Sequence, residues 1–298
     1  MPDVSAVIVT YDARPWIERS IESIRDRVRE LIVVDHGSSD GTVELVRERF
    51  PEARVLEREN RGFGAGNNAG MREASGDYVL LLNPDAWFLG DGLEKLVAFA
   101  EEHPEAGVVG PKLLHPDGSL QRSVRGDPTP WRIATEWFFL RKVAPRSRVF
   151  NAYHGGPVDY DSVYEAEWLG GACLLVRRAA LDEVGGFDED FFLFSEELDW
   201  CYRFRQHGWK VLFFPRAEVT HVIGASNDPR RYTDLVVSQL RFLQKHRGER
   251  EAERARRVFV AALRLRGLVF RGARGRMYRE AAQRLRSGKT AALLESRG

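Results

Sequence analysis

Apolar runs alternate with amphipathic segments over the first hundred residues. Runs rich in β-branched and aliphatic residues lie at residues 5–11 (SAVIVTY), 31–36 (LIVVDH), 53–59 (ARVLERE) and 78–83 (YVLLLN). Between them, residues 15–28, 42–50 and 65–74 repeat apolar positions at helical spacing. This alternation predicts a mostly parallel sheet with helices on both faces, and ligands of such sheets bind beyond the carboxyl ends of the strands.

Polar residues follow each predicted strand. Thr10 and Tyr11 end the first run, Asp35 ends the second, Asn60 follows the third, and Asn83-Pro84-Asp85 follows the fourth. We therefore expect the functional site at this edge of the sheet.

The second half of the chain has a less regular pattern. Residues 108–115 and 120–124, joined through Asp117-Gly118, predict a hairpin, and residues 126–166 lack a clear period and predict a long, partly ordered loop. Further strands are predicted at residues 168–178, 211–215 and 219–222, with helices at 178–184 and 195–207. From Pro229 onward the pattern is helical and arginine-rich, so we predict a catalytic domain at 1–228 and a basic helical extension at 229–298.

Composition restricts the class of protein. The chain has 298 residues, 43% of them hydrophobic, which excludes disordered, collagen-like and disulfide-scaffold proteins. Its net charge of +1 conceals an asymmetry: residues 230–298 hold 19 Lys and Arg against 6 acids (+13), which leaves 26 basic and 38 acidic residues (−12) for residues 1–229. A basic end on an acidic body indicates a negatively charged partner.

Cysteine content and hydropathy favour the cytoplasm. The two cysteines, Cys173 and Cys201, form no pairing pattern, the N-terminus lacks the features of a signal peptide, and no run of 18 apolar residues occurs. A cytoplasmic protein is expected, with contact to the inner face of the membrane left open.

Asp85 and Asp35 are the first candidates for chemistry. A carboxylate at the position of Asp85 can hold a divalent cation together with substrate phosphates, although Asn-Pro-Asp is equally typical of a turn. Asp35 precedes the capping residues of the next helix, which favours a ligand-binding role over a capping one.

Glycines and a pair of acids mark two further segments. Gly64-x-Gly66-x-x-Ala69 fits the dinucleotide-binding pattern, but it follows the third strand instead of the first. Glu196 and Glu197 open a helix after a Gly-Gly-Phe-Asp break, where a carboxylate can act as general base. His221, flanked by apolar residues, would by itself be interpreted as a structural histidine.

In order along the chain, TYDA, VVDHGSSDGT, ENRGFGAGNNAG, DYVLLLNPDA, WLGGACLLVRR, GGFDEDFFLFSEELDW and FPRAEVTHVIG resemble the family 2 glycosyltransferases of GT-A fold. The resemblance covers residues 4–226 and favours the rhamnosyltransferase-like branch. It implies an inverting, metal-assisted transfer of a sugar, with rhamnose favoured, from a dTDP- or UDP-sugar to a glycan or polyprenyl-diphosphate-linked acceptor in cell-surface polysaccharide synthesis.

The resemblance also implies roles for single residues. Thr10, Tyr11 and Asp35 would hold the nucleoside, and Asn60, Gly66 and Asn67 would line the donor site together with Asn83. Asp85 and His221 would bind Mg²⁺ or Mn²⁺, and Glu197, with Glu196 beside it, would be the base. Trp168, Trp200 and Arg203 would shape the donor and acceptor pockets. Two positions depart from the family pattern: Asn83 replaces the first acid of Asp-x-Asp, and Glu196-Glu197 replaces Glu-Asp.

Arginines recur with a period of seven in the extension. Arg257, Arg264 and Arg271 would form one stripe on a helix that also carries apolar residues, a pattern typical of an interfacial helix. Arg266 falls nearly opposite this stripe. An anionic membrane surface and packing against the acidic body or a second subunit of a homo-oligomer are equally consistent with the pattern, whereas nucleic acid is not expected because aromatic residues are not interleaved.

Two alternatives of other classes stay open at this point. A dinucleotide-dependent oxidoreductase of NAD type would rest on Gly64 and Gly66. A non-catalytic glycan-binding or assembly protein of the same fold would be favoured by Asn83, since its amide leaves one carboxylate for the cation.

Overall fold

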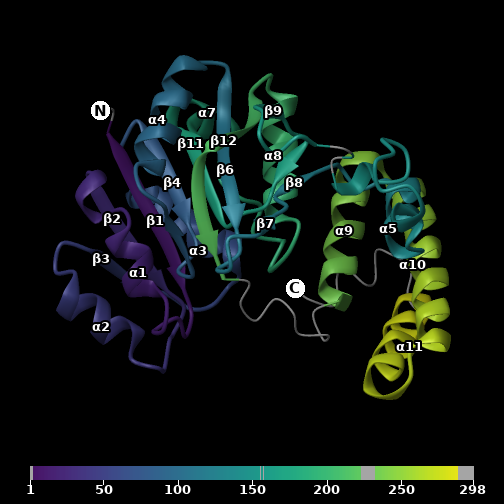
Figure 1. Cartoon of the computed structure of the whole chain (residues 1–298). Helices are drawn as coiled ribbons and strands as arrows, with labels where there is room; N and C mark the ends of the chain where they lie inside the picture. Colours follow the sequence, from purple (N-terminus) through teal and green to yellow (C-terminus); the bar gives the residue numbers. More distant parts are fainter. Residues whose placement is uncertain (1–2, 155, 157, 223–231, 288–298) are drawn as a thin grey trace. The chain divides into compact units, whose positions relative to one another are not determined.

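The computed structural model describes all residues except 1–2, 155, 157, 223–231 and 288–298. The chain divides into two compact units (Figure 1). Unit 1 comprises Met1–Val124, Asp159–Phe192 and Glu196–Gly224, and unit 2 comprises Arg125–Val158, Leu193–Ser195 and Ala225–Gly298. The predicted boundary between residues 228 and 229 lies outside the described residues and stays a prediction. Arg125–Val158 groups with the C-terminal helices, which the sequence pattern did not indicate.

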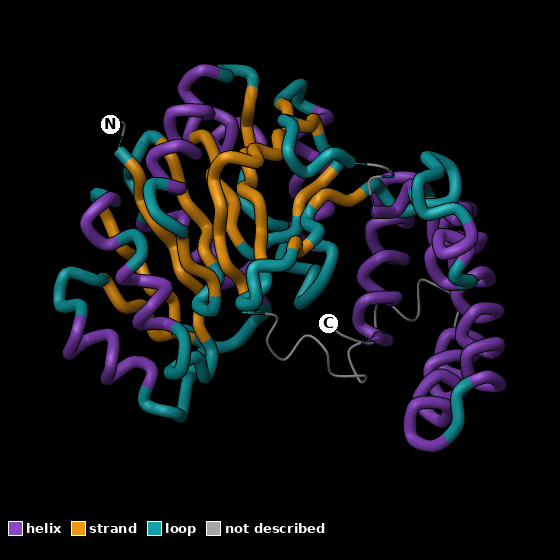
Figure 2. Tube along the Cα trace, viewed as in Figure 1, coloured by secondary structure: helices purple, strands orange, loops and turns teal. Residues whose placement is uncertain are grey.

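Unit 1 is built on one large mixed sheet, which Figure 2 shows with helices on either face. Its main strands are β1 (Val4–Thr10), β2 (Glu30–Asp35), β3 (Arg54–Glu57), β4 (Tyr78–Leu82), β5 (Ala86–Phe88), β6 (Ala106–Leu114), β11 (Cys173–Arg177) and β12 (Lys210–His221). Their order across the sheet is β3-β2-β1-β4-β11-β6-β12-β5. Two short strands extend this sheet: β7 (Leu120–Gln121) pairs with β6, and β9 (Tyr164–Glu165) pairs with β12. Strands β8 (Val124–Arg125) and β10 (Trp168–Leu169) form a separate two-stranded sheet.

The first four strands are parallel, as the β–α alternation predicts. Thr10 of β1 is paired with Asp35 of β2, so these two strands end side by side. The other half of the sheet is mixed: β11 runs antiparallel to both β4 and β6, whereas β6 and β12 are parallel. The start of β11 therefore lies at the same edge as the ends of β4, β6 and β12.

Two predicted features of the second half differ in detail from the structure. The strands expected at residues 211–215 and 219–222 are one strand, β12, which continues through an irregularity between Phe214 and Glu218 in its pairing with β6. The loop expected at 126–166 contains α5 (Pro130–Trp137), α6 (Leu140–Val143) and η2 (Ala152–His154). The hairpin expected from Asp117-Gly118 is confirmed, because β7 pairs antiparallel with the end of β6.

Helices cover both faces of the sheet. The helices of unit 1 are α1 (Ile17–Glu22), η1 (Arg25–Arg27), α2 (Thr42–Arg49), α3 (Phe63–Glu73), α4 (Gly92–Glu102), α7 (Arg178–Val184) and α8 (Glu196–Gln206). Ile17 of α1 and Leu96 of α4 belong to the same buried cluster as Ile8 of β1. Helix α3 packs on the other face, where a Cβ at Gly70 would lie 2.3 Å from the Val7 side chain.

Unit 2 is helical, as the pattern beyond Pro229 predicts. It contains α5, α6, η2, α9 (Tyr232–Arg247), α10 (Glu249–Val269) and α11 (Gly272–Ser287). Its buried residues include Phe259 and Leu263 of α10 and Tyr278 and Leu285 of α11. Among the described helices, none is both long and apolar enough to cross a membrane.

Arg266, which lies nearly opposite the predicted arginine stripe, has a structural role in unit 2. Its guanidinium donates two hydrogen bonds to the Trp137 carbonyl oxygen, at 3.1 and 3.0 Å, and lies over the rings of Trp137 and Phe139. Arg266 is thus part of the core of unit 2. The predicted stripe on one helix is wrong at its last member, because α10 ends at Val269 and Arg271 lies beyond it.

Candidate active site

Asp85 and His221 lie together at the carboxyl edge of the sheet. Strand β12 pairs with β5 so that His221 is opposite Ala86, the residue after Asp85. The His221 Nε2 atom is 3.3 Å from Asp85 Oδ1, and the Asn83 amide nitrogen is 3.4 Å from the same Nε2. The structure thus brings His221 next to Asn83 and Asp85, which lie more than 130 positions earlier in the chain.

Gln121 completes this group. Its Oε1 atom is 2.9 Å from His221 Nδ1. Because an amide oxygen only accepts, Nδ1 is the donor in this contact, which leaves Nε2 as the ring nitrogen that can bind a cation. Metal-binding histidines typically have such a partner on the other ring nitrogen. The sequence analysis missed Gln121, since its polar side chain in a short hairpin strand gives no signal by itself.

The residues present fit a hard divalent cation. Asp85 would contribute a carboxylate oxygen and His221 its Nε2 atom, two kinds of ligand that bind divalent cations, and the Asn83 side chain lies beside them. In the part of the chain that the structure describes, no cluster of three or more His, Cys, Asp or Glu side chains forms a complete metal site. Such an incomplete set is typical of cations that are also bound by substrate phosphates.

The ends of β1 and β2 form the predicted nucleoside region. Thr10 is buried, and its hydroxyl has no hydrogen-bond partner among the described residues. Tyr11, the next residue, is 59% exposed. A buried hydroxyl without a partner beside an exposed aromatic ring can bind one polar and one flat group of a ligand.

Asp35 organises the loop that follows β2. Its carboxylate accepts hydrogen bonds from the backbone N–H groups of Gly37 and Ser38, at 2.9 and 3.0 Å, and from the Ser38 hydroxyl. The Ser38 hydroxyl in turn accepts a hydrogen bond from the N–H of Asp12, at 2.9 Å, so Asp35 links the loops after β1 and β2. The structure shows this local role, and contact of Asp35 with a base stays a prediction.

Two of the predicted donor-site residues, Gly66 and Asn67, lie in α3, and Asn60 lies in the loop before it. A Cβ on Gly66 would lie 2.7 Å from the His36 ring and from Val9, so this glycine is required for packing of α3 on the sheet. Asn67 is buried and donates to the Phe63 carbonyl oxygen at 2.9 Å, and the Asn60 side chain accepts from the Gly62 N–H at 3.1 Å. Contacts of these residues with a donor sugar stay predictions.

Glu196, at the start of α8, is buried with 3% exposure, and its Oε2 atom has no hydrogen-bond partner among the described residues. Burial, followed by the charge of Glu197, raises the pKa of Glu196 well above its ordinary value. The protonated form of Glu196 is therefore favoured in the folded chain.

Glu197 is only partly buried. Its Cβ is 3.8 Å from the position that a Cβ on Gly171 would take, so it lies beside the turn between β10 and β11. The carbonyl oxygen of Ala172, the residue after Gly171, accepts a hydrogen bond from the Asn83 N–H at 2.9 Å. The partly exposed acid and the Asp85–His221 pair thus lie at the same edge of the sheet.

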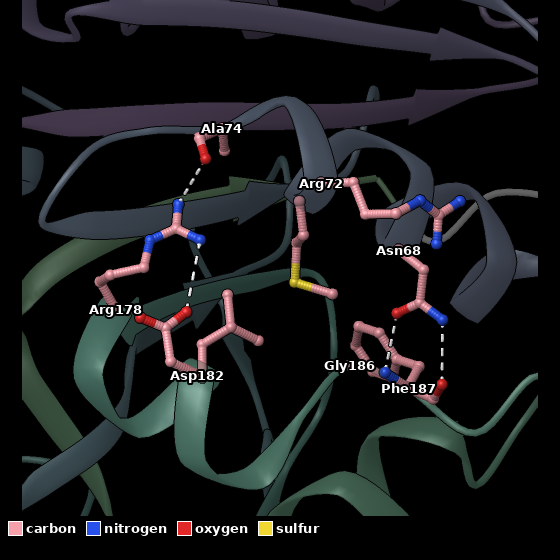
Figure 3. Close-up of a pocket in the computed structure, with 9 residues that line it drawn as sticks. Asn68, Arg72, Ala74, Arg178, Asp182, Gly186 and Phe187 are labelled. Atoms are coloured by element: carbon pink, nitrogen blue, oxygen red, sulfur yellow. Dashed lines mark hydrogen bonds and ion pairs between the residues drawn. The ribbon is translucent and has the colours of Figure 1, made fainter.

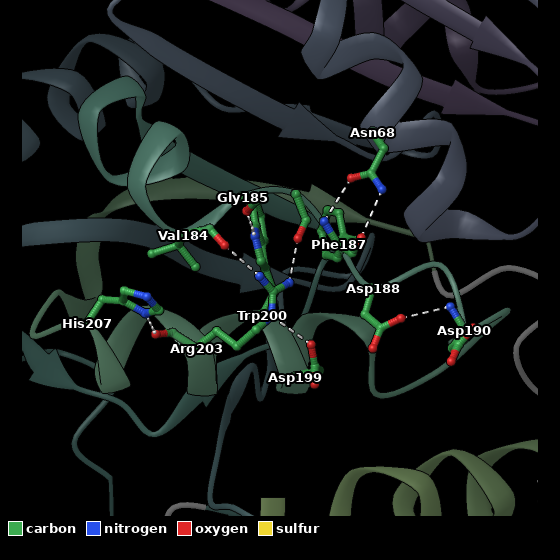
Figure 4. Close-up of polar contacts among 11 residues, drawn as sticks. Asn68, Val184, Gly185, Phe187, Asp188, Asp190, Asp199, Trp200, Arg203 and His207 are labelled. Carbon is green, nitrogen blue, oxygen red and sulfur yellow. Dashed lines mark hydrogen bonds and ion pairs between the residues drawn. The ribbon is translucent and has the colours of Figure 1, made fainter. Parts of the chain in front are cut away.

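Arg203 holds the loop ahead of α8 (Figure 4). Its guanidinium donates to Asp199, which is fully buried, at 2.9 Å, and to the carbonyl oxygens of Val184 and Gly186. Trp200 is also fully buried and donates to the Gly185 carbonyl oxygen at 2.8 Å. These contacts give Arg203 and Trp200 scaffold roles, whereas their predicted contacts with substrate stay untested. Trp168 of β10 is buried, with 8% exposure.

Asn68 is a second residue that the sequence analysis missed. Its side-chain amide donates to the Phe187 carbonyl oxygen at 2.9 Å and accepts from the Phe187 N–H at 2.8 Å (Figures 3 and 4). A pocket of about 370 Å³ lies beside it, between α3 and α7. No predicted site residue lines this pocket, so we do not assign it to the active site.

Solved structures identify the fold of this chain. A GalNAc-T7 structure with UDP, GalNAc and Mn²⁺ aligns with a TM-score of 0.59 and 17% identity over 82% of this chain and 48% of that chain. A mannosyltransferase from Pyrobaculum calidifontis with GDP-Man and Mn²⁺ aligns with a TM-score of 0.57 and 19% identity over 99% and 81%. The fold is the GT-A fold of nucleotide-sugar-dependent glycosyltransferases.

Sequence comparison then identifies the family. Residues 5–182 match the profile described as "Glycosyl transferase family 2". An N-acetylglucosaminyl-diphospho-decaprenol L-rhamnosyltransferase of Mycobacterium tuberculosis is 35% identical over 237 residues, which cover 74% of this chain and 76% of the relative. The chain belongs to glycosyl transferase family 2 and is a glycosyltransferase, which removes the oxidoreductase and non-catalytic alternatives.

Proposed function

We propose that this glycosyltransferase moves L-rhamnose from a nucleoside diphosphate donor, dTDP- or UDP-linked, to a polyprenyl-diphosphate-linked N-acetylglucosamine in cell-surface polysaccharide synthesis. The choice of sugar and acceptor rests on similarity to the mycobacterial rhamnosyltransferase. The structural observation that carries the metal-assisted mechanism is the Asp85–His221 pair, with Nε2 and Oδ1 3.3 Å apart at the edge where strands β4 and β12 end.

Asp85, His221 and Asn83 would hold the divalent cation, Mg²⁺ or Mn²⁺. When bound, the cation supplies positive charge next to the diphosphate that departs with the nucleoside. The residues of this chain hold that position before substrate arrives: Gln121 fixes the imidazole, and pairing of β12 with β5 fixes the distance from His221 to Asp85. Thr10, Tyr11 and Asp35 would bind the nucleoside at the neighbouring strand ends.

Glu197 is our choice for the general base. The acceptor hydroxyl oxygen forms a bond to the anomeric carbon of the sugar as the bond from that carbon to the diphosphate oxygen breaks, and the hydroxyl proton passes to the Glu197 carboxylate. Attack on the face opposite the leaving group inverts the anomeric centre. Burial and the charge of Glu197 raise the pKa of Glu196, which favours its protonated form and makes it the poorer candidate for the base.

Transfer assays with substituted proteins test this assignment. Asp85→Ala and His221→Ala should raise the concentration of Mn²⁺ needed for activity, and Glu197→Gln should lower kcat by about 10²–10⁴-fold, the range of general base catalysis. Asp117→Asn, an exposed acid in the nearby hairpin, serves as the control. Wild-type transfer rates in both Asp85→Ala and Glu197→Gln would show that the site is assigned wrongly, and a panel of nucleotide sugars would identify the donor.

An acceptor with a polyprenyl chain lies in a membrane. We therefore also propose a cytoplasmic enzyme attached peripherally to the inner membrane face through unit 2. A homo-oligomer stays a prediction.

A further inference from the structure

An exposed apolar and basic surface lies where α10 ends and α11 begins. Leu265, Leu268 and Val269 are 47%, 80% and 66% exposed, although leucine and valine are among the residues most often buried. Phe259 and Leu263, on the opposite side of the same helix, are fully buried. Helix α10 thus packs one apolar side inside unit 2 and presents a second apolar side to solvent.

Arginines surround these exposed side chains. Residues 264–287 contain eight arginines and one acid, Glu280. Of the eight, Arg266 alone is buried, in the core of unit 2. Arg264 and Arg286 form no ion pair with any described residue, so their charge is not neutralised within unit 2.

A groove between α10 and α11 joins the apolar and the basic side chains. It has a volume of about 650 Å³ and is lined by Arg264, Leu268, Arg279, Ala282, Gln283 and Arg286. Arg279 is oriented by a hydrogen bond to the Gly267 carbonyl oxygen. A lining that combines three arginines with Leu268 and Ala282 suits a phosphate group attached to hydrocarbon.

We propose that this surface docks on an anionic phospholipid bilayer, with Leu265, Leu268 and Val269 inserted among the acyl chains and a lipid headgroup phosphate in the groove. The charge of the surface is complementary to that of an anionic leaflet, and apolar side chains flanked by arginines are typical of interfacial helices. The inference rests on the proposed function only in that a lipid-linked acceptor requires access to a membrane.

Vesicle binding by the full chain, without donor or acceptor, tests the inference. Wild-type protein should bind phosphatidylcholine–phosphatidylglycerol vesicles about tenfold or more tightly than phosphatidylcholine vesicles. A triple variant, Leu265→Gln, Leu268→Gln and Val269→Gln, and a double variant, Arg264→Gln and Arg286→Gln, should each weaken binding to the anionic vesicles about tenfold or more.

Matched controls come from the same unit. Val143 and Val149 are 83% and 56% exposed on other elements of unit 2, and Arg250 is exposed at the start of α10. Val143→Gln with Val149→Gln, and Arg250→Gln, should leave vesicle binding unchanged. Helical circular dichroism and melting temperature should be unchanged in all variants, because every substituted side chain points to solvent.

Three outcomes would overturn the inference. The first is equal binding of wild-type protein to neutral and anionic vesicles. The second is unchanged binding to anionic vesicles by the triple and the double variant. The third is a wild-type protein that binds no vesicles but forms a dimer, which the triple variant no longer forms. Transfer to a short-chain, water-soluble acceptor separates this from the proposed function. If the proposed function is wrong, wild-type protein will not transfer the sugar to this acceptor. If only the proposed docking surface is wrong, transfer will be intact and the substitutions will not change vesicle binding.

Discussion

Gln121 determines which nitrogen of His221 can bind a cation. The two residues are 100 positions apart in the chain and meet because β7 pairs with β6 and β12 runs beside β6. Without an acceptor at Nδ1, the imidazole could protonate at Nε2 and turn its lone pair away from Asp85. Gln121 is therefore a positioning residue for the candidate metal site.

Gln121→Leu should weaken Mn²⁺ binding about 10- to 100-fold, the usual effect of removing such a partner. Mn²⁺ electron paramagnetic resonance measures the affinity directly, and the Mn²⁺ dependence of transfer should shift in parallel. Gln121→Glu, which retains an acceptor oxygen, should recover most of the affinity. Equal Mn²⁺ affinity in the leucine variant and wild type would contradict the role of Gln121.

Glu196 should make stability depend on pH. Its raised pKa means that the folded chain keeps a proton that the unfolded chain releases above the ordinary value of 4.5. Folding is therefore disfavoured progressively as pH rises above this value, by about 1.4 kcal/mol per unit of upward shift. Glu196→Gln cannot ionise and should gain melting temperature relative to wild type as pH increases above the ordinary value of 4.5.

Differential scanning calorimetry across this pH range measures the difference. Each kcal/mol should correspond to about 2–4 °C for a protein of this size. Glu44→Gln, which removes an exposed carboxylate of α2, is the control and should follow the wild-type profile. A constant difference between Glu196→Gln and wild type at all pH values would refute a buried, protonated Glu196.

At the scale of elements, the loop before α8 is stabilised by Arg203. Substitution by methionine would leave the Asp199 carboxylate buried without its 2.9 Å partner, and two carbonyl oxygens would lose their donors. Breaking a buried ion pair costs about 3–5 kcal/mol, so Arg203→Met should lower the free energy of unfolding by this amount. Arg47→Ala, which breaks an exposed pair with Glu57, should cost less than about 1 kcal/mol. Urea denaturation compares the two, and similar losses would contradict the structural role of Arg203.

The sequence predicted local elements well and their long-range pairing less well. Apolar periodicity located β1 to β4 and the hairpin from Asp117-Gly118, because these depend on neighbouring residues. It did not show that β11 inserts antiparallel between β4 and β6, since a short apolar run has the same pattern in either direction. Polar strand ends placed Asp85 at the carboxyl edge of the sheet, where the structure has it, whereas the contact of Gln121 with His221 could not be predicted because it depends on tertiary pairing.

At the scale of the whole molecule, near-neutrality results from two opposite charges. Residues 1–229 carry −12 and residues 230–298 carry +13. Attraction of the basic end to an anionic surface is screened by salt, since the Debye length falls from about 10 Å at 0.1 M to about 3 Å at 1 M. Vesicle binding should therefore fall about tenfold or more over this range, whereas transfer to a water-soluble acceptor should change much less. If vesicle binding and transfer to the water-soluble acceptor were equally sensitive to salt, the assignment of membrane binding to the basic end would be contradicted.

The pairing of β12 with β5 also has a consequence for the folding pathway. Asn83 and His221 are separated by 138 positions, and Gln121 lies between them. Contacts between distant segments form slowly, because closing a long loop costs entropy before any contact compensates for it. Strands β1 to β4 can pair while the chain between Asn83 and His221 is still unfolded. During refolding, Mn²⁺ binding should therefore appear late, at the step in which β12 pairs with β5.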